Sequence, residues 1–428
     1  MLRPNLYSLL ASVVILISAS SQAAAQYGPA PYGGMPYGSY ESGHQPFIQM
    51  PQSGRQAPIV DHYVESAPAL WDDSRPIEHF LTEVSRRSWI RVEYLHWNAR
   101  DLGNSKIGAP VAGLRTEQFE GFDNLNGGLS VGTSIIEDNG QLSLNNIPGV
   151  RGTWGLDLNG GAAELSFFGT SDREDTYANR NIRNFRSPLA PELGNVFSPN
   201  VIIPLLNNGG VSDVATLNGI VIDKSIEVSM SSQIWGAEAS LLTEAYLPGE
   251  GFKWQWLGGF RYLNLDEAWN LDGRYDAGGT VTERVTRVIS NTSNHVYGPE
   301  VGGRASIVSR WMTLSVTPRI AFALNDNSAA VTSDALGTGI ATRYTKSEVD
   351  FTTVTQVSFA GEVHLNPHFS LFGGYDFMWM PRITRPYENI NWNSQNAPAG
   401  GFIPDIQLGK RMKNYVLDGF SVGAVFRY

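Results

Sequence analysis

The sequence predicts an all-β protein that closes as an antiparallel, up-and-down transmembrane β-barrel of about ten strands. Three observations predict this fold. From Ser88 onward apolar and polar residues alternate with a period of two, which places successive side chains on opposite faces of a strand. The connections between the alternating segments are alternately short and long. The chain ends on an alternating apolar stripe whose last residue, Tyr428, is aromatic.

Composition narrows the class of protein. The 428 residues include 45 glycines, 11% aromatic residues and only 17% charged residues, with no cysteine. A formal charge of −10 argues against a surface that follows nucleic-acid phosphates. Zero cysteines exclude disulfide scaffolds, thiolate metal sites and cysteine nucleophiles. We therefore expect no nucleic-acid partner, no thiol chemistry and no cofactor.

Residues 1–25 are predicted to be a signal peptide. Arg3 precedes an apolar stretch, Leu9–Ile17, that is too short to span a bilayer. Small residues follow and indicate cleavage after Ala25. The alternative is a membrane anchor, but Ser, Gln and Ala rather than basic residues end the apolar stretch. We therefore expect an exported chain without a transmembrane helix.

Two segments precede the predicted barrel. Residues 26–60 repeat Tyr-Gly and Pro, a composition that cannot pack a core and predicts a disordered periplasmic lead. Residues 61–87 form a lead-in, where Phe80, Leu81 and Val84 share one face of a short amphipathic helix. Such a helix could lie on the membrane surface or enter a barrel lumen.

The barrel itself is predicted over residues 88–428, in ten segments. Each segment has one apolar and one polar face: Trp89–Asn98, Val150–Leu158, Ala163–Phe167, Trp235–Leu241, Trp254–Tyr262, Val301–Ile307, Met312–Phe322, Val357–Val363, Phe369–Trp379 and Phe420–Tyr428. Even-numbered segments are followed by tight turns and odd-numbered ones by loops of roughly 20 to 60 residues. Short periplasmic turns and long external loops are typical of outer-membrane barrels. A soluble β-sandwich has no reason to sort its loops in this way.

The strand count leaves one alternative open. A hairpin made from residues 201–228 would give a twelve-stranded barrel. The apolar run Val201–Leu206 within it could instead fold over the barrel mouth. The long loops are too extensive to be structureless on a compact domain.

Two sets of apolar residues suit a membrane. The aromatic girdles at the bilayer interfaces are predicted to include Trp254, Trp256, Tyr262 and Trp379. The carboxy-terminal stripe resembles the sorting signal that outer-membrane barrels present to their assembly machinery, and comprises Phe420, Val422, Phe426 and Tyr428. We therefore expect outer-membrane lipid and the barrel-assembly machinery as partners.

The polar face of the strands becomes the inner face of the barrel. Its predicted basic residues are Arg91, Arg151, Arg261, Arg304, Arg319 and Arg427. Its predicted acidic residues are Glu93, Asp157, Glu164, Glu238, Glu300, Glu362 and Asp376. Because isolated buried charges cost far more than paired ones, we expect a mostly plugged lumen laced with Arg–carboxylate pairs. The alternative is a charge-lined constriction that passes small solutes.

Short motifs recur in order along these segments. They are Trp89 with Glu93–Trp97, Gly149–Gly152, Trp235–Glu238, Gly258–Leu263 with Glu267, and Asn294 with Tyr297–Gly298 and Gly302. Their order and spacing resemble the putative beta-barrel porin family of planctomycete outer membranes. The resemblance covers roughly residues 88–428, and the Tyr-Gly-Pro lead has no counterpart in it. It implies a barrel fold and an outer-membrane location, and it names no substrate.

We do not expect an enzyme. A serine hydrolase needs a serine oriented by a histidine, and the chain has no Gly-x-Ser-x-Gly motif. Among the seven histidines, His295 alone is placed for surface chemistry. The acidic pair Asp266–Glu267 and the cluster within 172–175 could hold Ca²⁺, but solvated loop charge is the better interpretation and no metal site is expected.

Taken together, the pattern predicts an integral outer-membrane protein that is structural, or that passes small solutes weakly. An exported surface adhesin or ligand-binding β protein, acting through its long loops, is the alternative. The two differ in whether the alternating strands are embedded in the membrane.

Heat-modifiability separates these two classes. Isolated outer-membrane fractions should contain a form that shifts mobility on a detergent gel when boiled, because a closed barrel resists detergent until heated. Release into the soluble fraction at high salt, without any shift, would instead assign the alternation to a soluble β fold.

Overall fold

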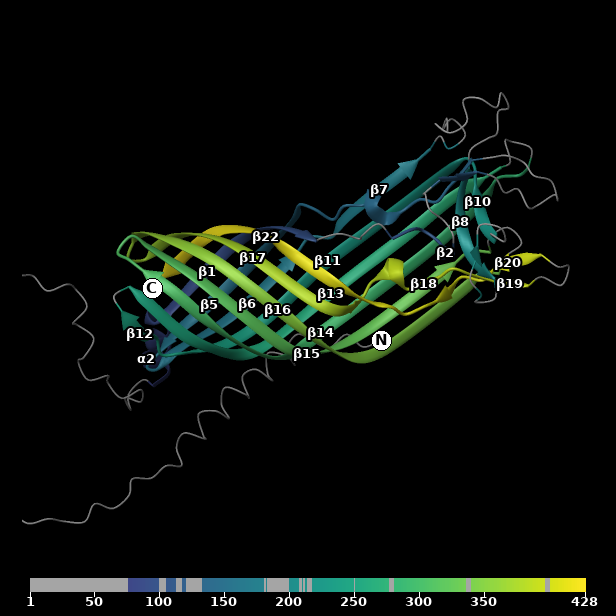
Figure 1. Cartoon of the computed structure of the whole chain (residues 1–428). Helices are drawn as coiled ribbons and strands as arrows, with labels where there is room; N and C mark the ends of the chain where they lie inside the picture. Colours follow the sequence, from purple (N-terminus) through teal and green to yellow (C-terminus); the bar gives the residue numbers. More distant parts are fainter. Residues whose placement is uncertain are drawn as a thin grey trace, which may run out of the picture. The chain divides into compact units, whose positions relative to one another are not determined.

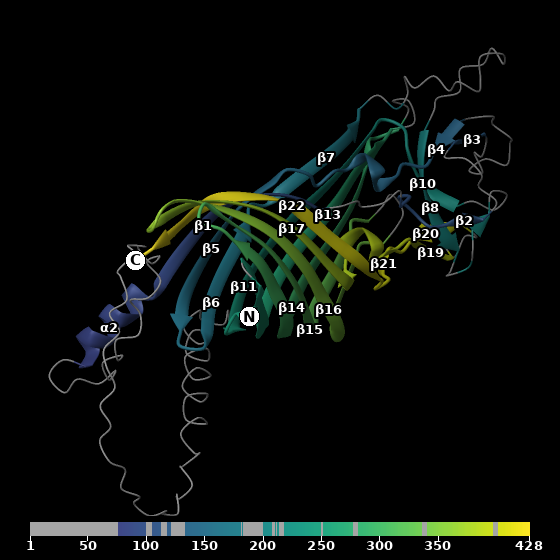
Figure 2. The same cartoon turned by 60° about the vertical axis from the view of Figure 1, so that its left-hand side comes forward.

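Ten antiparallel strands close into one ring in the computed structural model (Figures 1 and 2). The structure describes residues 76–99, 105–112, 118–120, 133–180, 182, 200–207, 210, 212–213, 218–249, 251–276, 281–335, 340–396 and 401–428. The ring strands are β1 (Ser88–Ala99), β5 (Ile147–Leu158), β6 (Gly161–Thr170), β11 (Ser225–Thr243), β13 (Phe252–Tyr275), β14 (Arg284–Val308), β15 (Met312–Ser333), β16 (Thr342–Asn366), β17 (Phe369–Thr384) and β22 (Met412–Arg427).

Each ring strand pairs with its neighbour in sequence, and the first strand pairs with the last. The seam between β1 and β22 runs from the pair Trp89 and Arg427 to the pair Ala99 and Leu417. All ten predicted segments lie in these strands, apart from Tyr428, which directly follows β22, so the predicted barrel fold is confirmed. The twelve-stranded alternative is not adopted, because β8 (Asn200–Asn207) and β10 (Asn218–Ile222) form a hairpin that pairs outside the ring.

The two ends of the ring differ. The turn end carries the short connections 159–160, 244–251, 309–311 and 367–368, with β12 (Tyr246–Gly249) pairing back onto β13 in the second. The loop end carries the long connections. Strands β13 to β16 have 22–25 residues, whereas β1, β5 and β6 have 10–12, so the wall is much taller on one side. On that side β7 (Arg173–Asn179) adds to β11 beyond the end of β6.

The outer face of the ring is apolar and exposed. Its exposed large side chains include Val92, Tyr94, Val150, Leu165, Phe167, Leu241, Phe260, Val301, Leu314, Phe322, Phe359, Val363, Leu371, Phe420 and Val422. A water-soluble protein would bury most of these groups, since an exposed apolar surface this extensive requires a covering partner. No helix among the described residues is long and apolar enough to cross a membrane.

The inner face changes character along the ring axis. Near the turn end it is polar and charged. Further toward the loop end every ring strand contributes a buried apolar side chain, at most 2% exposed, and we call this set the apolar ring: Trp97, Ile147, Phe168, Ile234, Leu263, Val296, Ala321, Val354, Met378 and Leu417. The alternation of charged and apolar residues does not predict this apolar layer.

The loop connections fill the lumen beyond the apolar ring. Residues 385–396 and 401–411, which follow β17, are called the plug segment; they hold η5 (Pro386–Glu388), β18 (Ile390–Asn391), β19 (Asn393–Asn396), β20 (Phe402–Pro404) and β21 (Gln407–Leu408). The η5 turn contacts β13 and β14, which are not neighbours of β17 in the ring. Trp392 of this segment packs edge-on against Trp269 of β13, with ring centroids 6.2 Å apart.

Shorter elements form in the other loops. They are β2 (Val111–Ala112), β3 (Gln118–Glu120), β4 (Thr133–Ile135), η2 (Asn139–Gln141) and β9 (Ser212–Asp213), together with the β8–β10 hairpin. Leu144, Ile203 and Ile222 from these loops are nearly fully buried in one cluster with the apolar ring. Figure 1 shows β8, β10, β19 and β20 gathered at the loop end.

The amphipathic helix forms as α2 (Pro76–Arg86), directly before β1. It is tied to the turn end, where the Asp157 amide donates to the Arg87 carbonyl at 3.0 Å and Arg87 donates to Asn159 at 2.6 Å. Phe80 and Leu81 are 49% and 58% exposed, so this face does not pack into the lumen. The predicted signal peptide, residues 1–25, and the lead, residues 26–60, lie outside the described residues.

Glycine at the seam allows the first and last strands to approach closely. A Cβ at Gly423 would lie 2.0 Å from the Val92 carbonyl oxygen of β1, so the strands would have to separate. A Cβ at Gly373, in the neighbouring strand β17, would meet nothing within 4 Å.

Gly423→Ala should therefore lower the free energy of unfolding by about 1–3 kcal/mol, the usual cost of overpacking. Thermal loss of the folded gel form measures the change. Gly373→Ala is the matched control and should behave like the unaltered protein; equal effects of the two substitutions would contradict the role given to the seam.

Candidate functional site

A polar cavity of about 380 Å³ occupies the turn-end half of the lumen, and we call it the vestibule. Inward side chains of all ten ring strands line it. Period-two alternation explains the lining, since the apolar residues of each strand face outward and their polar neighbours face in. The vestibule holds a dense set of charges and hydroxyls below the apolar ring.

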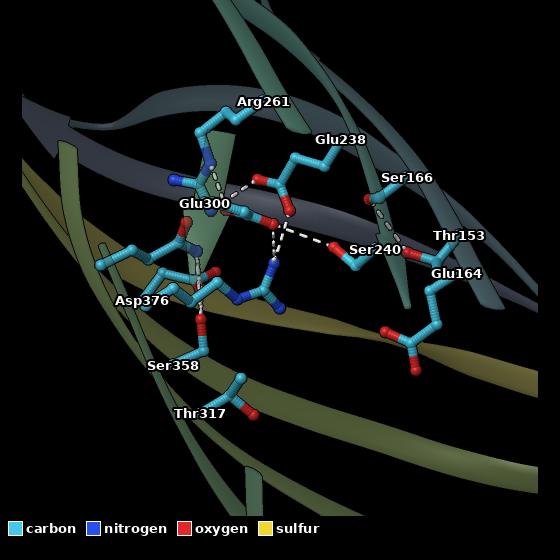
Figure 3. A network of polar contacts seen from close by, with 12 residues as sticks. Thr153, Glu164, Ser166, Glu238, Ser240, Arg261, Glu300, Thr317, Ser358 and Asp376 are labelled. Atoms are coloured by element: carbon cyan, nitrogen blue, oxygen red, sulfur yellow. Dashed lines mark hydrogen bonds and ion pairs between the residues drawn. The ribbon is translucent and has the colours of Figure 1, made fainter. Parts of the chain in front are cut away.

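Four charged residues form the first of two buried ion-pair networks. Arg261 contacts Glu238 and Glu300, each at 3.0 Å, and Arg319 contacts Glu238 at 2.6 Å. Ser240 donates to the second oxygen of Glu300 at 2.9 Å. Figure 3 shows Glu300 between Arg261 and Ser240, with Glu238 beside them. Both carboxylates therefore have partners on both oxygens.

The second network joins β1, β5 and β17. Arg91 contacts Glu93 at 2.7 Å, and Arg151 contacts Glu93 at 3.5 Å and Asp376 at 2.9 Å. Ser358 donates to the other oxygen of Asp376 at 2.6 Å. Aromatic faces add to the stabilisation of these cations, because Arg91 lies 4.6 Å from the Phe372 centroid and Arg151 5.3 Å from that of Trp97.

Two further pairs lie nearer the turn end. Arg304 makes a bidentate contact with Glu164, at 2.7 and 2.8 Å. Arg427 contacts Glu362 at 2.7 Å. The fork geometry of a guanidinium matches a carboxylate, which makes such contacts strong.

The structure brings together nearly all of the predicted lumen charges. Each of the six arginines contacts a carboxylate, and six of the seven acids are used. Asp157 is the exception, since it lines the vestibule near the turn end without an ion pair to any described residue. Lys253 also lines the vestibule and was not predicted. Lys253 has the same parity along the strand as Gln255 and Arg261, so alternation alone would have placed it on the inner face.

The other predicted residues lie on the outer face or at its edges. Trp254 and Trp256 pack edge to face near the turn end, with their ring centroids 5.4 Å apart. Tyr262 lies farther along β13, and its hydroxyl lies 2.8 Å from His295 Nδ1, within hydrogen-bond distance. This contact is a structural role for His295, the histidine considered for surface chemistry. Trp379 is 37% exposed on β17. Of the carboxy-terminal stripe, Phe420, Val422, Phe426 and Tyr428 are all exposed.

The acidic pair considered for Ca²⁺ is split by the strand. Asp266 is exposed, whereas Glu267 is 3% exposed and faces the lumen. There Glu267 makes a bidentate contact with Arg385 of the plug segment, at 2.6 and 2.9 Å. Neighbouring residues on one strand face opposite ways, so this pair cannot chelate one ion. The described residues contain no group of three or more His, Asp or Glu suited to a metal.

Comparison with known proteins gives one strong match. The family model described as "Putative beta barrel porin-7" matches residues 89–428, which includes every vestibule residue. Among solved structures, the outer membrane protease OmpT from Escherichia coli is similar at 8% identity and a TM-score of 0.41, covering 80% of this chain and 97% of that one. No curated protein matches the chain.

Removing the shared carboxylate of the first network tests its energetic role. Glu238→Ala leaves Arg261 and Arg319 short of a partner in a buried site, so the free energy of unfolding should fall by about 3–5 kcal/mol. Denaturant titration in detergent micelles, followed by tryptophan fluorescence, measures it. Asp157→Ala removes the unpaired acid and should change the value by less than about 0.5 kcal/mol. Equal losses of unfolding free energy in the two variants would contradict the stabilising role given to the network.

Proposed function

The chain belongs to the beta barrel porin-7 family, and from this premise we propose that it is a structural outer-membrane barrel, closed to solute flow in the conformation described. The family match confirms the family predicted from the sequence motifs. A planctomycete source stays a prediction. We further propose that the turn end faces the periplasm, as short turns do in such barrels.

The apolar ring is the observation that carries this proposal. Ten side chains, one from each strand, are at most 2% exposed, and loop residues of the same cluster cover them. A dry apolar layer offers no hydrogen-bonding path to a hydrated solute, and stripping water from polar groups costs several kcal/mol. The vestibule therefore ends blindly at the apolar ring.

Weak passage of solutes is the second candidate, and the plug segment favours it. Its contacts with the ring are both polar and apolar: Arg385 contacts Glu267, Ser290 donates to the Pro386 carbonyl, and Trp392 packs against Trp269. At its base Arg382 has a left-handed φ of 56°, which is strained for a residue other than glycine. Movement of this segment would open the loop end.

The proposals about partners and catalysis follow from the positions of the exposed and buried side chains. We propose lipid as the partner of the exposed outer face, and the assembly machinery as the partner of the carboxy-terminal stripe. We propose no catalytic role, because each of the six arginines of the lumen is paired with a carboxylate. An adhesin that acts through its loops remains the competing function, and a protein extractable without detergent would favour it.

Planar-bilayer recording tests closure. The unaltered protein should insert without stable channels. The double variant Glu267→Gln with Arg385→Gln removes one buried ion pair between the plug segment and the ring without leaving a charge unpaired, and it should show intermittent openings.

An exposed pair on the outside of the wall supplies the control. Arg287 and Asp272 contact each other at 2.8 Å, and Arg287→Gln with Asp272→Asn should stay as silent as the unaltered protein. Large, stable channels from the unaltered protein would overturn the closed barrel in favour of a porin.

A further inference from the structure

The helix α2 carries an apolar face that the described residues leave about half exposed. Phe80, Leu81 and Val84 recur at the spacing of one helix face, and Phe80 and Leu81 are 49% and 58% exposed. No described side chain of α2 lines the vestibule. A helix of 11 residues is marginal in water by itself, since isolated helices shorter than about 12–15 residues rarely persist. A partner that covers this face would therefore stabilise α2.

The carboxyl end of α2 is fixed to the first wall strand without a flexible loop. The Arg87 amide donates to the Glu83 carbonyl at 3.1 Å, and the Ser88 hydroxyl of β1 donates to the carbonyl of Val84 at 2.6 Å. The Arg87 carbonyl in turn accepts from the Asp157 amide of β5. Figure 2 shows α2 continuing from β1 beyond the turn end of the ring. The wall therefore sets the position of the helix.

This junction lies at the level where the apolar wall ends. The Tyr428 amide donates to the Ser88 carbonyl at 3.4 Å, which places the terminal aromatic residue beside the junction. Tyr428 is 62% exposed, and Tyr246 and Trp311, in the connections at the same end, are each 69% exposed. Exposed Tyr and Trp at the rim of a membrane barrel mark the level of the lipid headgroups. The helix therefore starts at the edge of the apolar outer face and is continuous with it.

The size and the charge of the helix favour a lipid surface as the partner. A stable protein interface needs about 20–30 residues on each side, whereas α2 offers a single short face. Residues 76–87 contain Glu78 and Glu83 against Arg86 and Arg87, and Glu83 contacts both arginines. Because these charges balance, apolar burial rather than net charge would hold the helix at a membrane.

From these features we infer that α2 is an interfacial anchor. It lies along the membrane surface at the turn end, with Phe80, Leu81 and Val84 at the boundary between the lipid headgroups and the acyl chains. The inference rests on the proposed contact of the outer face with lipid, and it adds a second membrane contact outside the ring. Of the two positions that an amphipathic helix before a barrel can take, it selects the membrane surface over the lumen.

Lipid-attached quenchers measure this position directly. The chain has no cysteine, so Leu81→Cys gives a single attachment site for an uncharged, environment-sensitive fluorophore. The full-length protein is reconstituted in phosphatidylcholine vesicles, with and without lipids that carry a doxyl group high on the acyl chain. These lipids should quench the label at least about twofold, because an interfacial helix buries its apolar face about 5–10 Å deep. Thr82→Cys, on the polar side of the helix, is the matched control and should be quenched much less.

A label on the wall separates this inference from the proposed membrane barrel. Val301 on the outer face of β14 is 51% exposed, so a label at Val301→Cys reports whether the wall itself contacts lipid. Quenching at Val301→Cys without quenching at Leu81→Cys would overturn the inference and leave the membrane barrel intact. Absence of quenching at both positions would overturn the membrane barrel and the anchor together. Heat-modifiability shows that each labelled variant folds.

The other outcomes separate lipid from other partners of the helix. Phe80→Ser, added to the labelled Leu81→Cys variant, should weaken the quenching because it removes apolar area, and unchanged quenching would contradict the anchor. Blue-shifted emission that the doxyl lipids do not quench would mean that protein covers α2, and would overturn the inference. Equal quenching at Leu81→Cys and Thr82→Cys, or loss of the quenching at high salt, would overturn it as well.

Discussion

The interior of a ten-stranded ring is slightly too wide for its own side chains to fill, and this constraint shapes the rest of the molecule. An eight-stranded ring can be packed by inward side chains alone. Here the remaining space inside the ring is filled differently at the loop end and at the turn end. Toward the loop end, chain from the long connections enters and completes a dry core. Toward the turn end the space stays polar, and guanidinium–carboxylate pairs span it.

The apolar core at the loop end and the ion pairs at the turn end depend on each other. Buried arginine–carboxylate networks are stable only when every member has a partner, and here each arginine has one. The apolar ring next to them keeps bulk water from entering through the loop end, which strengthens the pairs. Trp97 and Phe168 belong to both regions, since they form part of the apolar ring and lie under the Arg151 guanidinium.

Sequence patterning predicted the ring well because its signal is local. Alternation assigned Arg91 and Glu93 inward and Val92 and Tyr94 outward, and the strand carries them so. The same strand continues with Leu95 and Trp97 inward and the polar His96 and Asn98 outward, so the sense of the alternation reverses. If the inward positions had been followed along the strand beyond Glu93, its last charged residue, they would have predicted the buried apolar residues of the apolar ring.

Other features had no local signal. The contact between Glu267 and Arg385 joins residues 118 positions apart through a loop that crosses the lumen. The β8 strand of the β8–β10 hairpin is a continuous apolar run, and its pairing with β19 of the plug segment, which places it outside the ring, has no signal in the local sequence.

The seam between the first and last strands has a consequence for how the chain is made. Because β22 pairs with both β17 and β1, the ring closes only when the first and last strands of the barrel meet. Until then β1 exposes an unpaired edge with an apolar outer face. A chain that lacks β22 would keep this edge open, and β17 would lose its neighbour as well.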